Sequence, residues 1–267
     1  MASVENQEQR TAAIAGAGSV LGRDIVHGLA AKGSPTAEKT IGYALLAMTM
    51  VTGLVDAVSF LSLGRVFTAN MTGNIVLLAF AAAHVPGLSI ARSSTALLSF
   101  LVGAILGGRI MARASAEAQI QFAAQAFLLE IAFLFAASFC AIGYRGHLLE
   151  DSFQTFALIA LTALAMGTRN AAVRKLAIPD LTTTVLTLTI TGIAADSLIA
   201  NGNNPRLPRR VASVVAMFLG AALGALIIRY SISAALCLGT AISALCGVAL
   251  FRVLRMSAQS VRTKLDF

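Results

Sequence analysis

Long apolar runs separated by short polar segments fill the chain from Thr40 onward. A bilayer core of about 30 Å takes roughly 20 apolar residues of α-helix. All five prolines lie outside the apolar runs, which supports the boundaries because proline interrupts the helical hydrogen-bond ladder. The pattern therefore predicts up to eight membrane-spanning helices, over residues 41–63, 67–83, 95–112, 123–143, 153–170, 182–200, 211–229 and 231–253.

The second and sixth runs are short and rich in polar residues, so either is expected to be discontinuous or re-entrant. The predicted fold is an all-α, polytopic membrane helix bundle with about six to eight transmembrane helices and an internal duplication. We expect a polar N-terminal tail over residues 1–39, a transmembrane domain over 40–255 and a cytoplasmic C-terminal tail over 256–267. A glycine-containing stretch in the first tail lacks the spacing of a dinucleotide-binding turn and is interpreted as part of that tail.

Composition excludes the soluble classes. Apolar residues make up 57% of the chain, charged residues only 12%, and the mean hydropathy is +0.82. So few charges cannot coat a soluble globule of 267 residues. The net charge of +8 does not indicate a nucleic-acid binder, because the basic residues form no cluster with interleaved aromatic residues.

The basic residues predict an orientation instead. If all eight runs cross the membrane, thirteen of the twenty Lys and Arg residues fall on the side of the two termini. The positive-inside rule then predicts that both termini are in the cytoplasm.

The two halves of the chain resemble each other. Gly53 and Gly167 head similar segments 114 residues apart, and the GxxxG pairs of the third and seventh runs are 117 residues apart. These matches predict a duplication with repeats over residues 40–145 and 153–253. Four crossings per half would give both repeats the same orientation, related by a pseudo-two-fold axis along the membrane normal.

Three acidic residues lie within the predicted spans, namely Asp56, Glu130 and Asp196. A charge at the bilayer centre costs at least about 2.5–3.5 kcal/mol, so such residues usually face a bundle interior or a water-filled cavity. Asp56 is interpreted either as a cation or proton site or as a structural residue in a salt bridge or a helix-end contact. Glu130 carries the same two readings, and Asp196 lies close enough to a boundary to be solvated.

Amide and hydroxyl side chains add a candidate polar path. Asn70 and Asn74 share one helix face in the second run, with Thr72 and Gly73 between them. Asn170 in the fifth run and a threonine stripe in the sixth supply further polar groups. The candidate substrate- or ion-binding residues are Asp56, Asn70, Thr72, Gly73, Asn74, Glu130, Asn170, Thr184 and Thr187. Arg169 and Arg174 are expected to snorkel to the membrane surface, with binding of an anion or of lipid headgroups as the alternative.

Other motifs are structural or missing. The GxxxG pairs allow close helix approach, within the chain or in an oligomer. The three histidines and three cysteines show no metal-ligand spacing. The chain carries no nucleophile elbow, P-loop or zinc-protease motif. The sequence therefore predicts no catalytic residue, no metal and no cofactor, and the chain is not expected to be an enzyme.

Two stretches resemble a known family. Residues 53–74 (GLVDAVSFLSLGRVFTANMTGN) closely resemble the signature of the YoaK family of bacterial membrane proteins. Residues 166–174, followed by 183–187, look like the second motif of that family. The resemblance covers roughly residues 40–255. It implies a multi-pass location in the bacterial inner membrane and a helical fold, and it assigns no activity and no functional residues.

The predicted function is that of a transporter or permease for a small solute or ion. Its site is expected between the first, second, fifth and sixth runs, where the motif residues converge if the repeat is real. The alternative is a membrane protein that transports nothing and binds lipid or a protein partner. The predicted partners are the lipid bilayer and a small solute or ion, with no nucleic acid.

Overall fold

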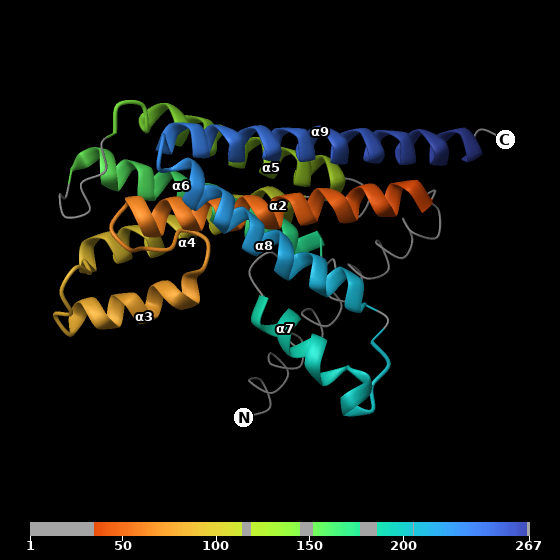
Figure 1. The fold of residues 1–267 in the computed structure, drawn as a ribbon. Helices are drawn as coiled ribbons and strands as arrows, with labels where there is room; N and C mark the ends of the chain where they lie inside the picture. Colours follow the sequence, from red (N-terminus) through yellow and green to blue (C-terminus); the bar gives the residue numbers. More distant parts are fainter. Residues whose placement is uncertain (1–34, 114–118, 145–151, 177–185, 205, 266–267) are drawn as a thin grey trace, which may run out of the picture.

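The computed structural model describes residues 35–113, 119–144, 152–176, 186–204 and 206–265. These residues form helices and connections without any strand, which confirms the all-α prediction (Figure 1). The glycine-containing stretch near the N-terminus and Thr184 lie outside the described residues. The helices are α2 (Pro35–Ser62), α3 (Met71–Ala82), α4 (Ile90–Ala112), α5 (Gln119–Cys140), α6 (Phe153–Leu176), α7 (Leu186–Ala195), the 3₁₀ helix η1 (Leu198–Ala200), α8 (Leu207–Ile227) and α9 (Ile232–Leu265).

Six of these helices are long and apolar enough to cross a membrane: α2, α4, α5, α6, α8 and α9. Helix α3, in the second predicted run, has 12 residues, and the described part of the sixth predicted run begins with the 10-residue helix α7. At 1.5 Å per residue they are about 18 and 15 Å long, too short for a 30 Å core. Six crossings lie within the predicted range of six to eight, and we read the two short helices as re-entrant because neither is long enough to cross.

Helix direction follows from which residues share a core. We call end A the end of the bundle where α2 ends and α4 begins, and end B the opposite end. Helices α2, α5 and α8 run from end B to end A, whereas α4, α6 and α9 run from end A to end B. Because each half contains three crossings instead of four, α2 and its equivalent α6 are antiparallel. The repeats are inverted, so the predicted parallel repeat, with its axis along the membrane normal, is wrong.

Glycine contacts show that the two halves interlock. Gly53 of α2 packs against the carbonyl of Met217 in α8, and Gly167 of α6 packs against the carbonyl of Phe100 in α4. The two glycines are 114 residues apart and their two partners 117 residues apart. Helix α2 of the first half therefore packs on α8 of the second half, and α4 of the first half packs on α6 of the second half.

The GxxxG glycines belong to the same two crossings. Gly103 and Gly107 lie against Leu164 and Thr168 of α6, and Gly220 and Gly224 lie in the same way against Met50 and Leu54 of α2. The close approach that GxxxG permits is thus used inside the chain. These glycines are not available to an oligomer interface, which corrects that part of the prediction.

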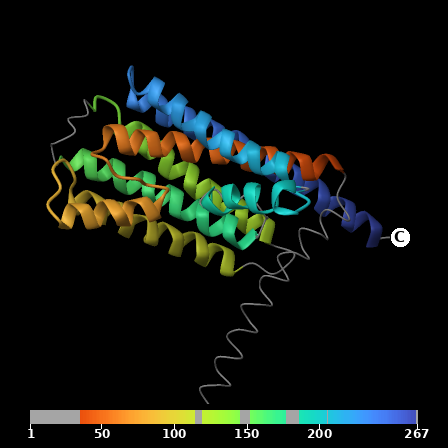
Figure 2. The same cartoon turned by 60° about the horizontal axis from the view of Figure 1, so that its bottom comes forward.

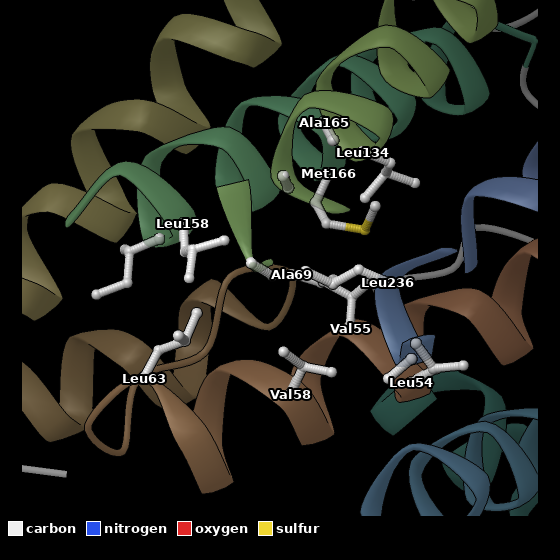
Figure 3. Close-up of a cluster of buried hydrophobic side chains, with 14 of the residues drawn as sticks. Leu54, Val55, Val58, Leu63, Ala69, Leu134, Leu158, Ala165, Met166 and Leu236 are labelled. Carbon is white, nitrogen blue, oxygen red and sulfur yellow. The ribbon is translucent and has the colours of Figure 1, made fainter. Parts of the chain in front are cut away.

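Two apolar clusters fill the bundle, one toward each end. Cluster A, toward end A, includes Val55, Leu63, Ala69, Leu158 and Met166, most of which Figure 3 shows converging between the helices. Cluster B, toward end B, includes Leu45, Met48, Phe127, Val173 and Leu250. Outside the bundle, large apolar side chains such as those of Phe139, Phe218 and Leu245 are 70–72% exposed, as expected for a surface that faces lipid.

The short helices α3 and α7 begin near each other in the middle part of the bundle and run apart in opposite directions (Figures 1 and 2). Helix α3 leads to end A, where α4 begins. Helix α7 leads to end B, where Arg210 in the first turn of α8 donates to the carbonyl of Gly192 at 2.6 Å. Asp196, after the end of α7, pairs with the same arginine at 2.6 Å and is half exposed.

Candidate functional site

Asp56 holds the loop that leads into α3. Its Oδ1 accepts hydrogen bonds from the backbone N–H groups of Thr68 at 3.1 Å and Ala69 at 2.9 Å. Its Oδ2 accepts from Nδ2 of Asn70 at 2.5 Å, and the side chain is only 5% exposed. Asp56 lies six residues before the end of α2, so the loop returns about 9 Å into the bundle along that helix.

Asn74 fastens the first turn of α3 to its surroundings. Its Nδ2 donates to the carbonyl of Ser93 in α4 at 3.2 Å, and its Oδ1 accepts from the N–H of Phe67 at 3.4 Å. Thr72 is exposed, and Gly73 faces the ring of Phe67. The structure thus brings Asp56, Asn70 and Asn74 together as one anchor of the re-entrant loop, which we call the Asp56 anchor.

Two candidates of the second half lie within the described residues. Asn170 of α6 is half buried, and Thr187 of α7 is exposed. Asn170 is the repeat equivalent of Asp56, because the two positions are 114 residues apart. Glu130, another predicted site residue, is fully buried in the core of the bundle.

Glu130 forms an ion pair with Arg169, and both side chains are fully buried. Arg169 Nη1 donates to the carbonyl of Met48 at 2.8 Å and to Thr52 Oγ1 at 3.1 Å, both on α2. Its Nη2 donates to Glu130 Oε1 on α5 and to Ser243 Oγ on α9, the latter at 2.9 Å. We call Thr52, Glu130, Arg169 and Ser243 the central polar cluster. The prediction that Arg169 snorkels is wrong, because its guanidinium finds these partners in the core.

On α5, α6 and α9 the central polar cluster lies between the two apolar clusters, whereas Thr52 of α2 lies among residues of cluster A, four residues from Met48 of cluster B. On α6, Arg169 stands between Met166 of cluster A and Ala172 of cluster B. On α5, Glu130 stands between Leu134 of cluster A and Phe127 of cluster B. Glu130 and Ser243 are also near the middle of their spans. The charges are thus at mid-depth and closed off toward both ends.

The arginine has no counterpart in the other repeat. The position 114 residues before Arg169 is Val55, a fully buried member of cluster A. The first half therefore packs the same position with an ordinary core residue. Packing does not require a charge there, so the ion pair is a specialised feature of one half.

Two atoms of the ion pair lack a hydrogen-bond partner among the described residues, namely Glu130 Oε2 and Arg169 Nε. A buried polar group without a partner costs about 1–3 kcal/mol, and more when it is charged. Such an atom normally binds water, an ion or a ligand. No group of three or more His, Cys, Asp or Glu side chains in the described parts of the chain could hold a metal ion.

Sequence reasoning identified Glu130 and missed its partners. Arg169 was assigned to the membrane edge because its run seemed to end at residue 170, whereas α6 continues to Leu176. Thr52 and Ser243 looked like ordinary small polar residues. The repeat could have indicated Arg169, because it aligns this charged residue with the apolar Val55 of the first half.

The architecture defines a multi-pass membrane protein whose described residues form two inverted halves, each with three helices long enough to cross a membrane and one short α-helix. The family described as a protein of unknown function, DUF1275, matches residues 44–249, and the chain belongs to that family. The chain is also 35% identical over 152 residues to the UPF0700 transmembrane protein YoaK of Bacillus subtilis strain 168. That alignment covers 57% of this chain and 65% of the relative. The family resemblance seen in residues 53–74 is thus confirmed, and no solved structure matches.

Proposed function

We propose that the protein moves a small solute or ion across the membrane and binds it at the central polar cluster. The observation that carries this proposal is the position of the cluster, at mid-depth, between the repeats and closed toward both ends. Arg169 and Ser243 come from the second repeat, whereas Thr52 and Glu130 come from the first. Inverted-repeat transporters bind their substrates in this kind of place.

Clusters A and B supply the two barriers that a transporter needs. With both in place the central polar cluster is occluded. Because the repeats are inverted, the movement that opens one end in one half has an equivalent that opens the other end in the other half. Loosening cluster A would expose Arg169 and Glu130 to end A, and loosening cluster B would expose them to end B.

The Asp56 anchor lies beside cluster A and borders the path toward end A. Ala69, whose N–H donates to Asp56, is itself a member of cluster A. We assign to Asp56, Asn70, Thr72, Gly73 and Asn74 the lining of this entrance. To their counterparts Asn170 and Thr187 we assign the lining of the entrance at end B. The proposed activity is passage alone and involves no covalent chemistry.

Charge distribution orients the path. Apart from Arg169 in the core and the part of α9 beyond Arg252, nine basic residues of the described chain belong to end B: Lys39, Arg109, Arg113, Arg174, Lys175, Arg206, Arg209, Arg210 and Arg252. Three belong to end A: Arg65, Arg92 and Arg229. By the positive-inside rule end B, with both termini, faces the cytoplasm and the protein lies in a bacterial inner membrane.

Thiol accessibility tests the proposal. Ser243→Cys is made in a protein whose native Cys140, Cys237 and Cys246 are replaced by alanine, and membranes are treated with a small charged thiol reagent. We expect Ser243→Cys to react, because transport requires water to reach the central polar cluster. Leu245→Cys is the control on the same helix, since Leu245 is 71% exposed and faces lipid, where a charged reagent does not enter. Equal, negligible labelling of both variants would contradict the proposal.

A further inference from the structure

The central polar cluster has two polar atoms without a hydrogen-bond partner among the described residues, one a donor and one an acceptor. A guanidinium has five N–H donors, and those on the two terminal nitrogens of Arg169 bind Met48, Thr52, Glu130 and Ser243. The donor without a partner among the described residues is the N–H of Nε. On the carboxylate, Oε1 is engaged and Oε2 is not. The cluster thus offers one hydrogen-bond donor and one acceptor, on adjacent side chains.

The charges of the central polar cluster cancel. Glu130 and Arg169 are one acid and one base in contact, both fully buried. A cation that approached Glu130 would also approach Arg169, and an anion at Arg169 would also meet Glu130. The two Coulomb terms are of similar size and opposite sign. An ion would therefore lose its water at this depth without a compensating charge.

A neutral molecule avoids that cost. If it carries both a hydroxyl or N–H donor and an oxygen acceptor, it can donate to Glu130 Oε2 and accept from Arg169 Nε. Each bond satisfies a buried group that otherwise remains unpaired. Because clusters A and B close the space on either side, the molecule must be small.

We propose that the solute is a small neutral molecule with both a hydrogen-bond donor and an acceptor, of the polyol or amide class. This inference rests on the proposed function and narrows the solute bound at the same cluster. Glu130 and Arg169 are the residues that determine specificity, since both contact the solute directly. Thr52 and Ser243 are positioning residues that hold the guanidinium.

Proteoliposomes with a panel of probes test the inference. Glycerol and urea are the neutral probes, followed by light scattering after an osmotic step. Potassium and chloride are the ionic probes, followed by a voltage-sensitive dye. We expect glycerol or urea to pass about tenfold faster than through empty liposomes, and the ions to pass no faster. Glu130→Gln keeps the size of the side chain and removes the charge and one acceptor. It is expected to lower the neutral flux about tenfold, as loss of one buried hydrogen bond to a charged group predicts.

Two further measurements separate folding from specificity. Each variant is first shown to elute as the same species as the wild-type protein. Asp196→Asn is the control, because Asp196 lies outside the bundle core and pairs with Arg210, so its flux stays unchanged. Passage of potassium or chloride without passage of a neutral probe would overturn the inference and leave the proposed transport standing. Passage of no probe at all would count against both, and a neutral flux unaltered by Glu130→Gln would remove Glu130 from the site.

Discussion

Replacing Gly220 with alanine tests the interlocked repeats. A Cβ on Gly220 would overlap the carbonyl oxygen of Met50, and a Cβ on its repeat equivalent Gly103 would overlap the carbonyl of Leu164 in the same way. Backbone atoms of a crossing helix cannot rotate aside, so each pair of helices must separate. A gap of 0.5–1 Å forfeits a quarter to a half of the dispersion attraction across a contact. Overpacking of this kind costs about 1–3 kcal/mol, and we expect the upper end at both sites.

The matched control is Gly108→Ala in α4. A Cβ at Gly108 meets nothing within 4 Å, although the neighbouring Gly107 is in the crossing. Alanine there should raise stability by about 0.5–1 kcal/mol through helix propensity alone. For a chain of this size 1 kcal/mol shifts the melting temperature by about 2–4 °C. We therefore expect Gly220→Ala and Gly103→Ala to melt about 6–12 °C lower than the wild-type protein.

Far-UV circular dichroism in detergent measures the melting, because the chain has no tryptophan for fluorescence. The refuting result is simple to recognise. If Gly220→Ala and Gly103→Ala melt at the temperature of Gly108→Ala, the two crossings are not as close as the structure has them. If only one of the two shifts, the halves do not interlock symmetrically.

Two more predictions concern buried polar groups. Arg169→Leu should destabilise the protein by about 3–5 kcal/mol because it leaves Glu130 buried without its partner, and the double variant with Glu130→Met should recover most of that loss. Additive losses in thermal unfolding of the two single variants and the double variant would show that the pair is not coupled. Asp56→Asn should speed amide exchange of Thr68 and Ala69 about tenfold or more, because an amide cannot accept from all three donors. Exchange unchanged in a peptide covering residues 63–70 by mass spectrometry would show that Asp56 does not hold the loop.

The positions of the spans could be predicted because they depend on local composition. Runs of about 20 apolar residues identified all six crossings. The polar content around Asn70 and the threonines of the sixth run also indicated that those two segments are discontinuous or re-entrant. What local composition could not decide was whether a run that is almost long enough crosses. Four crossings per half were predicted and the structure has three, and this difference reverses the relative orientation of the repeats.

The candidate site was predictable only in part, for a different reason. Asp56 and Asn70 are close in sequence, and their contact lies within one motif. The partner of Glu130 is 39 residues away on another helix, and Ser243 is a further 74 residues from Arg169. Such pairs depend on how helices pack, which no local pattern encodes. The charge of Arg169 favoured a place at the membrane surface. Its hydrogen bonds and its ion pair with residues of other helices offset the cost of burying it.

Sidedness of the two connections around α3 tests the inverted repeat most directly. Arg65→Cys lies before α3 and Val85→Cys lies after it, and both positions are exposed. In a cysteine-free background, an impermeant thiol reagent is added from one side of sealed cells and then from the other. With α3 re-entrant, both cysteines are at end A and label from the same side, the periplasmic one. Labelling from opposite sides would mean that α3 crosses the membrane, and the inverted repeat would be wrong.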